Sequence, residues 1–291
     1  LFLLISVTLL AVPNDFRFRH FSVEDGLSSN SVRAIMQDKY GFLWIGTEEG
    51  LNRYDGIMIK SYSICPQAAG KYISSLYGTK KNIWIGTDEG IYIYAYATET
   101  FTYFDLTTPN NVRITSIVNH ILQDKDGNLW FSTNGQGLFR YNLSKNYLEQ
   151  YEFTSAFGIV ASTMADSDNQ IWALTNQGES GVYKLNKAEN KFEPFGLLYN
   201  AGNHHSQALA MLEDSEQTLW LGTWECGLQK IDKYTRQTTT YLHPTDGKGV
   251  THIHSLMEYA PHQLLIGSDD GLLLFNTCLL YTSPSPRDLS T

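Results

Sequence analysis

Two pairs of histidines are the first candidates for metal binding or acid–base chemistry in this 291-residue chain. His252 and His254 flank a single residue, so in an extended strand their imidazoles would lie on the same face. His204 and His205 are adjacent in the sequence. A zinc site needs three or four protein ligands, and no third ligand accompanies either pair at a recognisable spacing. The sequence therefore predicts no metal site at these histidines.

An aspartate-rich segment imitates the start of a calcium-binding loop. Asp124, Asp126 and Asn128 have the spacing of the first three ligands of such a loop. However, Leu129 stands where the loop requires glycine, and Gly135 stands where it requires a bidentate glutamate. We interpret the segment as a hairpin turn, and we expect neither a metal ion nor another cofactor in the chain.

A repeated phrase centred on tryptophan indicates which elements position these residues. Two of its copies are Leu43–Thr47 (LWIGT) and Leu219–Thr223 (LWLGT), and a sixth copy at 264–268 has Leu265 in place of tryptophan. Successive tryptophans lie 40, 46, 42 and 48 residues apart. The column consists of Trp44, Trp84, Trp130, Trp172 and Trp220. A repeat of about 40–50 residues with several short strands per unit is typical of a β-propeller.

The third unit illustrates how one blade is encoded. Apolar runs at Val118–Gln123 and Leu129–Thr133 predict an inner and a second strand, separated by the turn 124–128. Further strands are expected at 138–141 and 147–153. Because tight turns join antiparallel neighbours, each unit should form a four-stranded blade. The predicted fold is an all-β propeller with about six such blades visible in the sequence.

Several repeated positions are expected to be structural. The tryptophans should pack between adjacent blades, and the Thr or Ser that ends each second strand should satisfy backbone groups. A basic column at Arg53, Arg140, Lys184 and Lys230 is most simply a solvated sheet face. A glycine closes the second turn of every unit, at Gly50, Gly90, Gly137, Gly181, Gly227 and Gly271.

The most polar loops are predicted to emerge on one face of the propeller. Carboxylates, amides and imidazoles beside an exposed aromatic ring suit sugar hydroxyls, although loop tips are also polar simply because water surrounds them. Trp224, which lies outside the repeat column, could stack on a sugar, pack against its neighbours or contact a second subunit. Arg33 and His254 occupy equivalent inner-strand positions and could line the central channel. The candidate ligand-binding residues are Asn30, Arg33, His204, His205, Trp224, Glu225 and His254.

The two ends of the chain differ from the repeats. Residues 1–12 are almost continuously apolar, too short for a bilayer span but typical of a signal-peptide core, so we interpret 1–13 as a truncated signal peptide and 14–277 as the propeller. The alternative is a buried strand or helix. Segment 16–21 resembles an outer strand and could complete the last blade. We interpret 278–291, which places two prolines close together, as a non-native or frameshifted tail outside the fold; the alternative is a genuine linker.

The composition excludes several classes of protein. A hydrophobic content of 42% with 18% charged residues is typical of a globular chain. The net charge of −9 argues against binding to nucleic acid or to an anionic membrane surface. The three cysteines match no zinc spacing, and their odd number argues against a disulfide framework.

Segment 18–56 resembles the start of the periplasmic sensor region of hybrid two-component histidine kinases, which is built from two-component regulator propeller repeats. The matching phrases are 25–28 (DGLS), 37–41 (QDKYG), 43–47 (LWIGT), 50–56 (GLNRYDG) and 123–130 (QDKDGNLW). The resemblance extends over about 16–277, although the fourth and sixth units depart from the pattern.

The resemblance implies a periplasmic sensor that belongs to an inner-membrane protein. Members of the family carry two seven-bladed propellers, a small β-sandwich, one membrane helix and a histidine kinase, and often a receiver and an AraC-type DNA-binding domain. They sense breakdown products of polysaccharides and switch on genes for glycan use. We therefore expect part of a seven-bladed propeller that binds an oligosaccharide, dimerises through the full-length parent and meets the membrane only through segments outside this sequence.

Two other functions stay open at the level of the sequence. The chain has no phospho-acceptor histidine box and no ATP-binding glycines, so we expect the fragment itself not to be an enzyme. A propeller glycosidase or lyase is the main alternative; hydrolysis would need two carboxylates, such as Glu225 and Asp269, converging to about 5–10 Å. The second alternative is a secreted propeller that acts as a protein-interaction scaffold.

Overall fold

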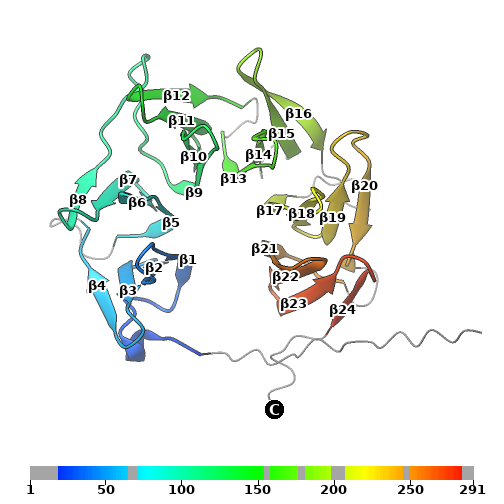
Figure 1. The fold of residues 1–291 in the computed structure, drawn as a ribbon, viewed down its shortest axis with the longest axis horizontal. Coiled ribbons are helices and arrows are strands. Elements are labelled where there is room, and N and C mark those ends of the chain that lie inside the picture. Colours follow the sequence, from blue (N-terminus) through cyan, green and yellow to red (C-terminus); the bar gives the residue numbers. More distant parts are fainter. Residues whose placement is uncertain are drawn as a thin grey trace, which may run out of the picture.

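The computed structural model describes residues 19–64, 71–153, 158–175, 181–197, 207–244 and 249–283. These residues form six separate four-stranded antiparallel sheets arranged around a common centre (Figure 1). The described residues therefore form six blades of a β-propeller, in agreement with the six units visible in the sequence. The expected signal peptide at 1–13 lies outside the described residues, as does the first half of segment 16–21.

Each blade contains four strands that follow one another in the sequence and in the sheet, from the inner strand to the outer strand. The first three blades contain β1 (Val32–Gln37), β2 (Leu43–Thr47), β3 (Gly50–Tyr54), β4 (Ile59–Tyr62), β5 (Ile73–Gly78), β6 (Asn82–Thr87), β7 (Gly90–Ala95), β8 (Thr100–Tyr103), β9 (Val118–Gln123), β10 (Leu129–Thr133), β11 (Leu138–Asn142) and β12 (Tyr147–Tyr151). The last three contain β13 (Val160–Ala165), β14 (Ile171–Thr175), β15 (Gly181–Asn186), β16 (Lys191–Leu197), β17 (Ala208–Glu213), β18 (Leu219–Thr223), β19 (Leu228–Ile231), β20 (Thr238–Tyr241), β21 (Ile253–Ala260), β22 (Gln263–Ser268), β23 (Gly271–Asn276) and β24 (Tyr281–Ser283). A short 3₁₀ helix, η1 (Val23–Asp25), precedes the first blade. Among the described residues, no helix has the length and apolar character needed to span a membrane.

The ends of the propeller differ from the prediction. Arg19, His20 and Phe21, the described part of segment 16–21, form no strand. The outer strand of the sixth sheet is instead β24, which pairs with β23. Since β24 lies within 278–291, the propeller extends into a segment that we had placed outside the fold.

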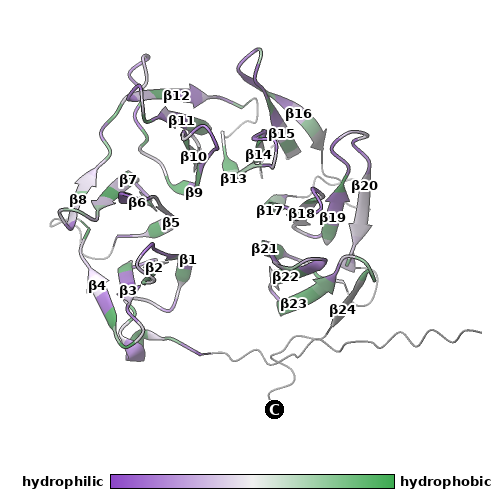
Figure 2. Ribbon diagram, in the orientation of Figure 1, coloured by the Kyte–Doolittle hydropathy of each residue, from purple (hydrophilic) through white to green (hydrophobic). Residues whose placement is uncertain are grey.

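The hydrophobic core lies between the blades. Hydrophobic residues are concentrated in the strands and hydrophilic residues in the connecting turns (Figure 2). Five hydrophobic clusters each combine residues of two consecutive blades. In the first junction, for example, Trp44 packs with Ile83, Ile85 and Tyr94 of the second blade. This confirms that the tryptophan column packs between blades.

In four blades, an aspartate in the turn between the first and second strands holds the tryptophan ring; three of these aspartates are buried and Asp214 is partly exposed. The indole Nε1 donates to the carboxylate six residues earlier, over 2.7–2.9 Å, in the pairs Asp38–Trp44, Asp124–Trp130, Asp166–Trp172 and Asp214–Trp220. The other oxygen of each carboxylate accepts backbone N–H groups of the same turn. The sequence had indicated only a turn at these aspartates.

The repeated hydroxyl and basic columns also have structural roles. The hydroxyl that ends each second strand donates to the carbonyl oxygen of the glycine that closes the turn, as Thr47 does to Gly50 over 3.0 Å. This confirms the predicted backbone role. The basic column is not simply solvated, because its cationic groups lie 5.2–5.9 Å from the tryptophan ring centroids of the neighbouring strand. These residues are Arg53, Arg140, Lys184 and Lys230.

Candidate ligand-binding face

The turn between the second and third strands of a blade lies beside the start of its inner strand. A backbone hydrogen bond joins the two in four blades: the N–H groups of Glu48, Asn134, Trp224 and Asp269 donate to the carbonyl oxygens of Ser31, Ile117, Gln207 and His252. Both sets of loops therefore emerge on one side, as predicted. We call this surface the loop face and define it as 28–33, 48–49, 71–72, 88–89, 112–117, 134–136, 224–226, 249–254 and 269–270.

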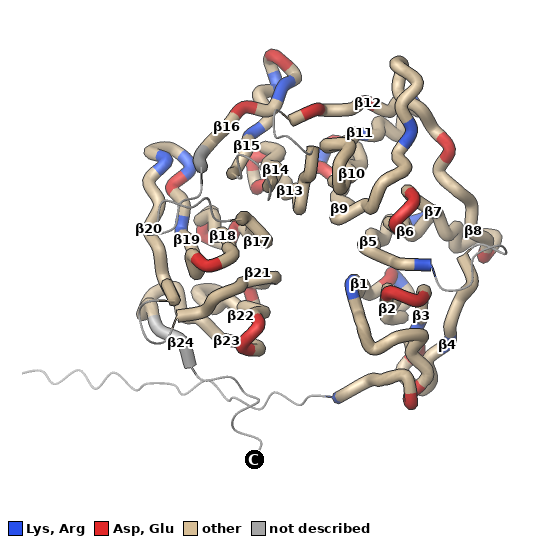
Figure 3. Tube along the Cα trace, turned by 180° about the vertical axis from the view of Figure 1, so that it is seen from behind, with Lys and Arg blue, Asp and Glu red and all other residues tan. Residues whose placement is uncertain are grey.

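Acidic turns on the loop face pair with bases at or just before the inner strand. Arg33 Nε donates to Glu48 Oε1 over 3.0 Å, and Lys71 pairs with Glu89. The hydrogen bond from Arg33 lowers the pKa of Glu48 and raises that of Arg33 itself. Figure 3 shows acidic turns beside β2 and β3 and beside β22 and β23, with a basic position on β1.

The sixth blade carries imidazoles where the first blade carries a guanidinium. His254 Nε2 lies 2.6 Å from Asp269 Oδ1, and His252 Nδ1 contacts Asp269 Oδ2. These two hydrogen bonds lower the pKa of the Asp269 carboxyl. Two residues predicted to line the channel, Arg33 and His254, thus have equivalent acidic partners in their own blades.

Trp224 reaches across the junction from the fifth blade to this cluster. Its ring stacks on His252, with centroids 3.7 Å apart and planes inclined by 28°. The centroid of His254 lies 6.5 Å away in an edge-on orientation. Because the Trp224 side chain is still 39% exposed, its ring offers apolar surface directly beside polar groups.

The other predicted residues are distributed unevenly. Glu225 is exposed next to Trp224, with a left-handed φ of 66°, and its N–H donates to the Thr251 carbonyl oxygen over 2.6 Å. Asn30 lies near the first blade, where its Oδ1 accepts from the backbone N–H of Val23 over 2.9 Å and so supports η1. His204 and His205 lie outside the described residues.

The structure therefore gathers Trp224, Glu225 and His254 at the junction of the fifth and sixth blades, and it leaves Asn30 and Arg33 at the first blade. His252 and Asp269 were not among the seven candidate ligand-binding residues, although the sequence had suggested Asp269 together with Glu225 as a possible catalytic pair. The two-residue spacing of the histidines was a usable signal for a shared face. Nothing in the sequence indicated that the acidic turn 269–270 folds back onto them.

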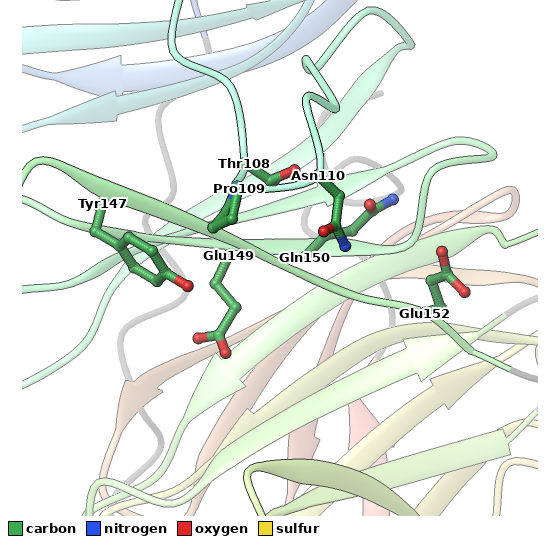
Figure 4. A pocket seen from close by; sticks show the side chains of 7 residues that line it. All are labelled: Thr108, Pro109, Asn110, Tyr147, Glu149, Gln150 and Glu152. Atoms are coloured by element: carbon green, nitrogen blue, oxygen red, sulfur yellow. The ribbon is translucent and has the colours of Figure 1, made fainter.

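A hollow of about 560 Å³ lies at the outer edge of the third blade, outside the loop face (Figure 4). It is lined by Thr108, Pro109, Asn110, Tyr147, Glu149, Gln150 and Glu152, none of which the sequence had singled out. The Glu149 carboxylate already accepts hydrogen bonds from Arg140, Tyr151 and Asn190. This carboxylate serves the packing of the outer strand, so the hollow is a weaker candidate than the loop face.

Comparison with known proteins identifies the repeat. Residues 26–49 and 112–135 match the sequence model of the family described as two component regulator propeller. The chain contains two-component regulator propeller repeats. In both matched stretches the regulator propeller repeat runs from the loop before the inner strand to the turn after the second strand. It therefore includes the Asp–Trp pair and two segments of the loop face, one at each end.

Several known proteins are similar to parts of the regulator propeller or to its fold. Histidine kinase P4 of Formosa agariphila is 45% identical over 67 residues, which are 23% of this chain and 5% of the kinase. The extracellular domain of a putative hybrid two component system from B. thetaiotaomicron has a TM-score of 0.74 at 23% identity, over 92% of this chain and 37% of that one. Virginiamycin B lyase from Staphylococcus aureus has a TM-score of 0.68 at 15% identity, over 88% and 84% of the two chains. The two structural likenesses show the fold alone, and the chain spans only about a third of the sensor domain.

Proposed function

We propose that this propeller is the extracytoplasmic ligand-sensing part of a membrane hybrid sensor histidine kinase. The regulator propeller repeats and the similarity to a histidine kinase over 67 residues support this assignment. The sensor would lie in the periplasm as the exported part of an inner-membrane protein. Phosphotransfer and dimerisation would belong to the rest of that protein.

The ligand that we propose is an oligosaccharide, bound on the loop face at the junction of the fifth and sixth blades. The observation that carries this proposal is the exposed Trp224 ring beside His252, His254 and Asp269. A sugar presents an apolar ring face and a rim of hydroxyls, so it can stack on an aromatic ring while carboxylates and imidazoles bind its hydroxyls. Figure 3 shows that this side of the molecule is rich in acidic turns, which can accept such hydrogen bonds.

The signalling step follows from linkage between binding and conformation. A ligand that prefers one arrangement of the dimer shifts the population towards that arrangement by its difference in affinity for the two. The shift would pass through a membrane helix outside this sequence to the kinase, which would control genes for glycan use.

Binding is tested by calorimetric titration of the purified chain with defined oligosaccharides from partial digests of plant, algal and host polysaccharides. We expect at least one saturable ligand, with affinity reduced at least about fivefold by Trp224→Ala because stacking is lost. Tyr234→Ala is the matched control, since Tyr234 is 87% exposed in the turn between β19 and β20, away from the loop face. Binding of no saccharide, or equal losses in both variants, would contradict the proposal.

A lyase or glycosidase is the second candidate, because His252, His254 and Asp269 form a cluster capable of acid–base chemistry on an exposed face. Chromatography of the same mixtures after prolonged incubation distinguishes the two. A sensor leaves every oligosaccharide intact. Turnover that disappears in the Glu225→Gln, Asp269→Asn double variant would establish an enzyme instead.

A further inference from the structure

Three side chains of the sixth blade direct potential metal-ligand atoms at one another. His252, His254 and Asp269 each offer one such atom, and the three atoms lie within 4.8 Å of one another. Among the described residues, no other group of three His, Cys, Asp or Glu side chains converges in this way. The two histidines and the aspartate come from opposite ends of the β21–β22 hairpin, which brings the start of one strand beside the end of the other.

The backbone holds this arrangement in place. His252 and His254 lie on one face of the strand because Ile253, between them, points the other way and is fully buried against Gly222 of the fifth blade. The N–H of Asp269 donates to the carbonyl oxygen of His252 over 3.4 Å, which fixes the turn relative to the strand. Trp224 packs flat on His252 and restricts the orientation of its imidazole.

The first blade shows what is distinctive about the sixth. There the equivalent acid, Glu48, pairs with Arg33, whose guanidinium has no lone pair to offer and stays protonated. In the sixth blade the bases are imidazoles, which are good metal ligands when neutral. The same acid-and-base geometry therefore provides a permanent ion pair in one blade and three potential ligand atoms in the other.

We propose that His252, His254 and Asp269 bind a divalent transition-metal ion such as Zn²⁺. Two imidazole nitrogens and one carboxylate oxygen form a donor set that suits zinc and similar ions and disfavours calcium and magnesium. Zinc ligands at about 2.0–2.2 Å from the ion lie about 3.3–3.5 Å from one another. The observed separations of up to 4.8 Å therefore require only small side-chain movements. The metal would replace the two hydrogen bonds that the imidazoles now make to the carboxylate.

The site would keep open coordination positions. The Asp269 and His254 side chains are 51% and 48% exposed, so water or a ligand oxygen can complete the coordination from the solvent side. This inference does not depend on sugar binding, because the three side chains alone form the site.

The experiment is a calorimetric titration of the tag-free, EDTA-treated chain with ZnCl₂, repeated with NiCl₂ while Trp fluorescence is recorded. We expect one ion per chain, little competition from CaCl₂, and quenching by Ni²⁺ because Trp224 lies against a ligand. His252→Ala and Asp269→Asn should each weaken binding at least about tenfold, as even outer-shell changes at metal sites often do.

Two controls make the result decisive. His262→Ala should bind normally, because His262 faces only one carboxylate, Glu216, over 3.4 Å. The double variant His204→Ala, His205→Ala should also bind normally. The proposal is overturned if the wild type shows no saturable binding, or if binding follows His262 or the 204–205 pair. Circular dichroism verifies that each variant is folded; should His252→Ala unfold, the more exposed His254→Gln replaces it.

Discussion

At the scale of single residues, the hydrogen bond between aspartate and tryptophan is the clearest repeated stabilising contact in the propeller. The second blade lacks this aspartate, and its tryptophan differs from the others. Thr79 begins a turn that is one residue shorter than those with the aspartate. The N–H of Thr79 donates to the carbonyl oxygen of Asn82, three residues later, whereas the N–H of Asp38 donates to that of Phe42, four residues later. Trp84 Nε1 consequently has no hydrogen-bond partner among the described residues. The aspartate therefore joins the turn to the core, and its effect on stability can be measured separately in each blade.

Replacing Asp124 by asparagine tests this role. The substitution keeps the shape but can point an N–H₂ group at the Trp130 N–H, so one buried donor loses its acceptor. We expect the free energy of unfolding to fall by about 1–3 kcal/mol, measured by urea denaturation. Asp126→Asn in the same turn is the control, since Asp126 is exposed and, among the described residues, its carboxylate accepts a single side-chain hydrogen bond, from Asn169 Nδ2 at the surface. Equal effects of the two substitutions would show that the turn, and not the indole contact, requires the acid.

His120 gives a prediction about pH. Burial lowers the pKa of this imidazole to about 4, from an ordinary value of 6.5, and its Nδ1 has no hydrogen-bond partner among the described residues. Between pH 4 and pH 6.5, the imidazole of His120 is therefore protonated in the unfolded chain and neutral in the folded chain. The contribution of His120 to stability is complete above pH 6.5 and is lost as the pH drops towards 4, by at most about 3 kcal/mol.

Urea denaturation of the wild type and of His120→Asn between pH 7 and pH 4 tests this effect. The variant should lose distinctly less stability over that range. Asp25, Asp55 and Asp232 also have lowered pKa values, but their contributions disappear only below about pH 4, as the folded carboxyls become protonated. Parallel pH profiles for wild type and variant would mean that His120 can be protonated in the folded state.

At the scale of the strand and turn, the glycine that closes the second turn is required for two reasons. Gly137 has a φ of +76°, and a Cβ there would lie 2.3 Å from the carbonyl oxygen of Tyr151. Gly127, in the preceding turn of the same blade, has a φ of +83° with nothing within 4 Å of a Cβ. The two positions share the backbone cost of a left-handed residue and differ only in the clash.

Alanine at each position separates these costs. Gly127→Ala should lower the free energy of unfolding by about 1–2 kcal/mol, the cost of a left-handed conformation in a residue with a side chain. Gly137→Ala should cost clearly more, because the clashing atom belongs to the backbone of β12 and cannot move without disturbing the β11–β12 pairing. Thermal unfolding of the pair measures the difference, and indistinguishable values would show that β12 can shift away.

The strands were largely predictable because each is encoded locally. In the third unit, the apolar runs 118–123 and 129–133 coincide with β9 and β10, and the outer strand ends two residues earlier than expected. The contacts between elements were not predictable in the same way. The repeat locates the turn 269–270, but it does not show that Asp269 reaches His252 and His254 or that Trp224 joins them from another blade. The contact of the basic column with the tryptophan rings was not foreseen, because it depends on the cross-strand register, as in Trp44 opposite Arg53.

At the scale of the whole molecule, the same contact recurs at each junction between consecutive blades, but it is missing between the sixth blade and the first. The first residue of the inner strand packs on the second strand of the preceding blade, as Ile73 does on Gly46 and Val118 on Gly86. These first residues are fully buried in the second to sixth blades. Val32, the equivalent residue of β1, is 46% exposed, and a Cβ at Gly267 of the sixth blade would meet only Ser255 of β21, in its own blade.

The inner strands β21 and β1 accordingly lack the extensive contact that joins every other consecutive pair among the described strands. Figure 1 shows the first and sixth blades standing apart at the bottom of the ring. We propose that a further repeat occupies this junction in a seven-bladed propeller, with its inner strand packed on Gly267 and its second strand against Val32.

Val32→Asp and Val118→Asp test this proposal as a matched pair. Val118 is fully buried, so an aspartate there should cost several kcal/mol in any chain that contains it. In the present chain Val32→Asp should change the free energy of unfolding by less than about 0.5 kcal/mol, as expected for an exposed site. In a chain extended by one more repeat, the same substitution should become about as costly as Val118→Asp, because the added blade would bury the charge. A large effect of Val32→Asp in the present chain would instead mean that the six blades close directly on one another in solution.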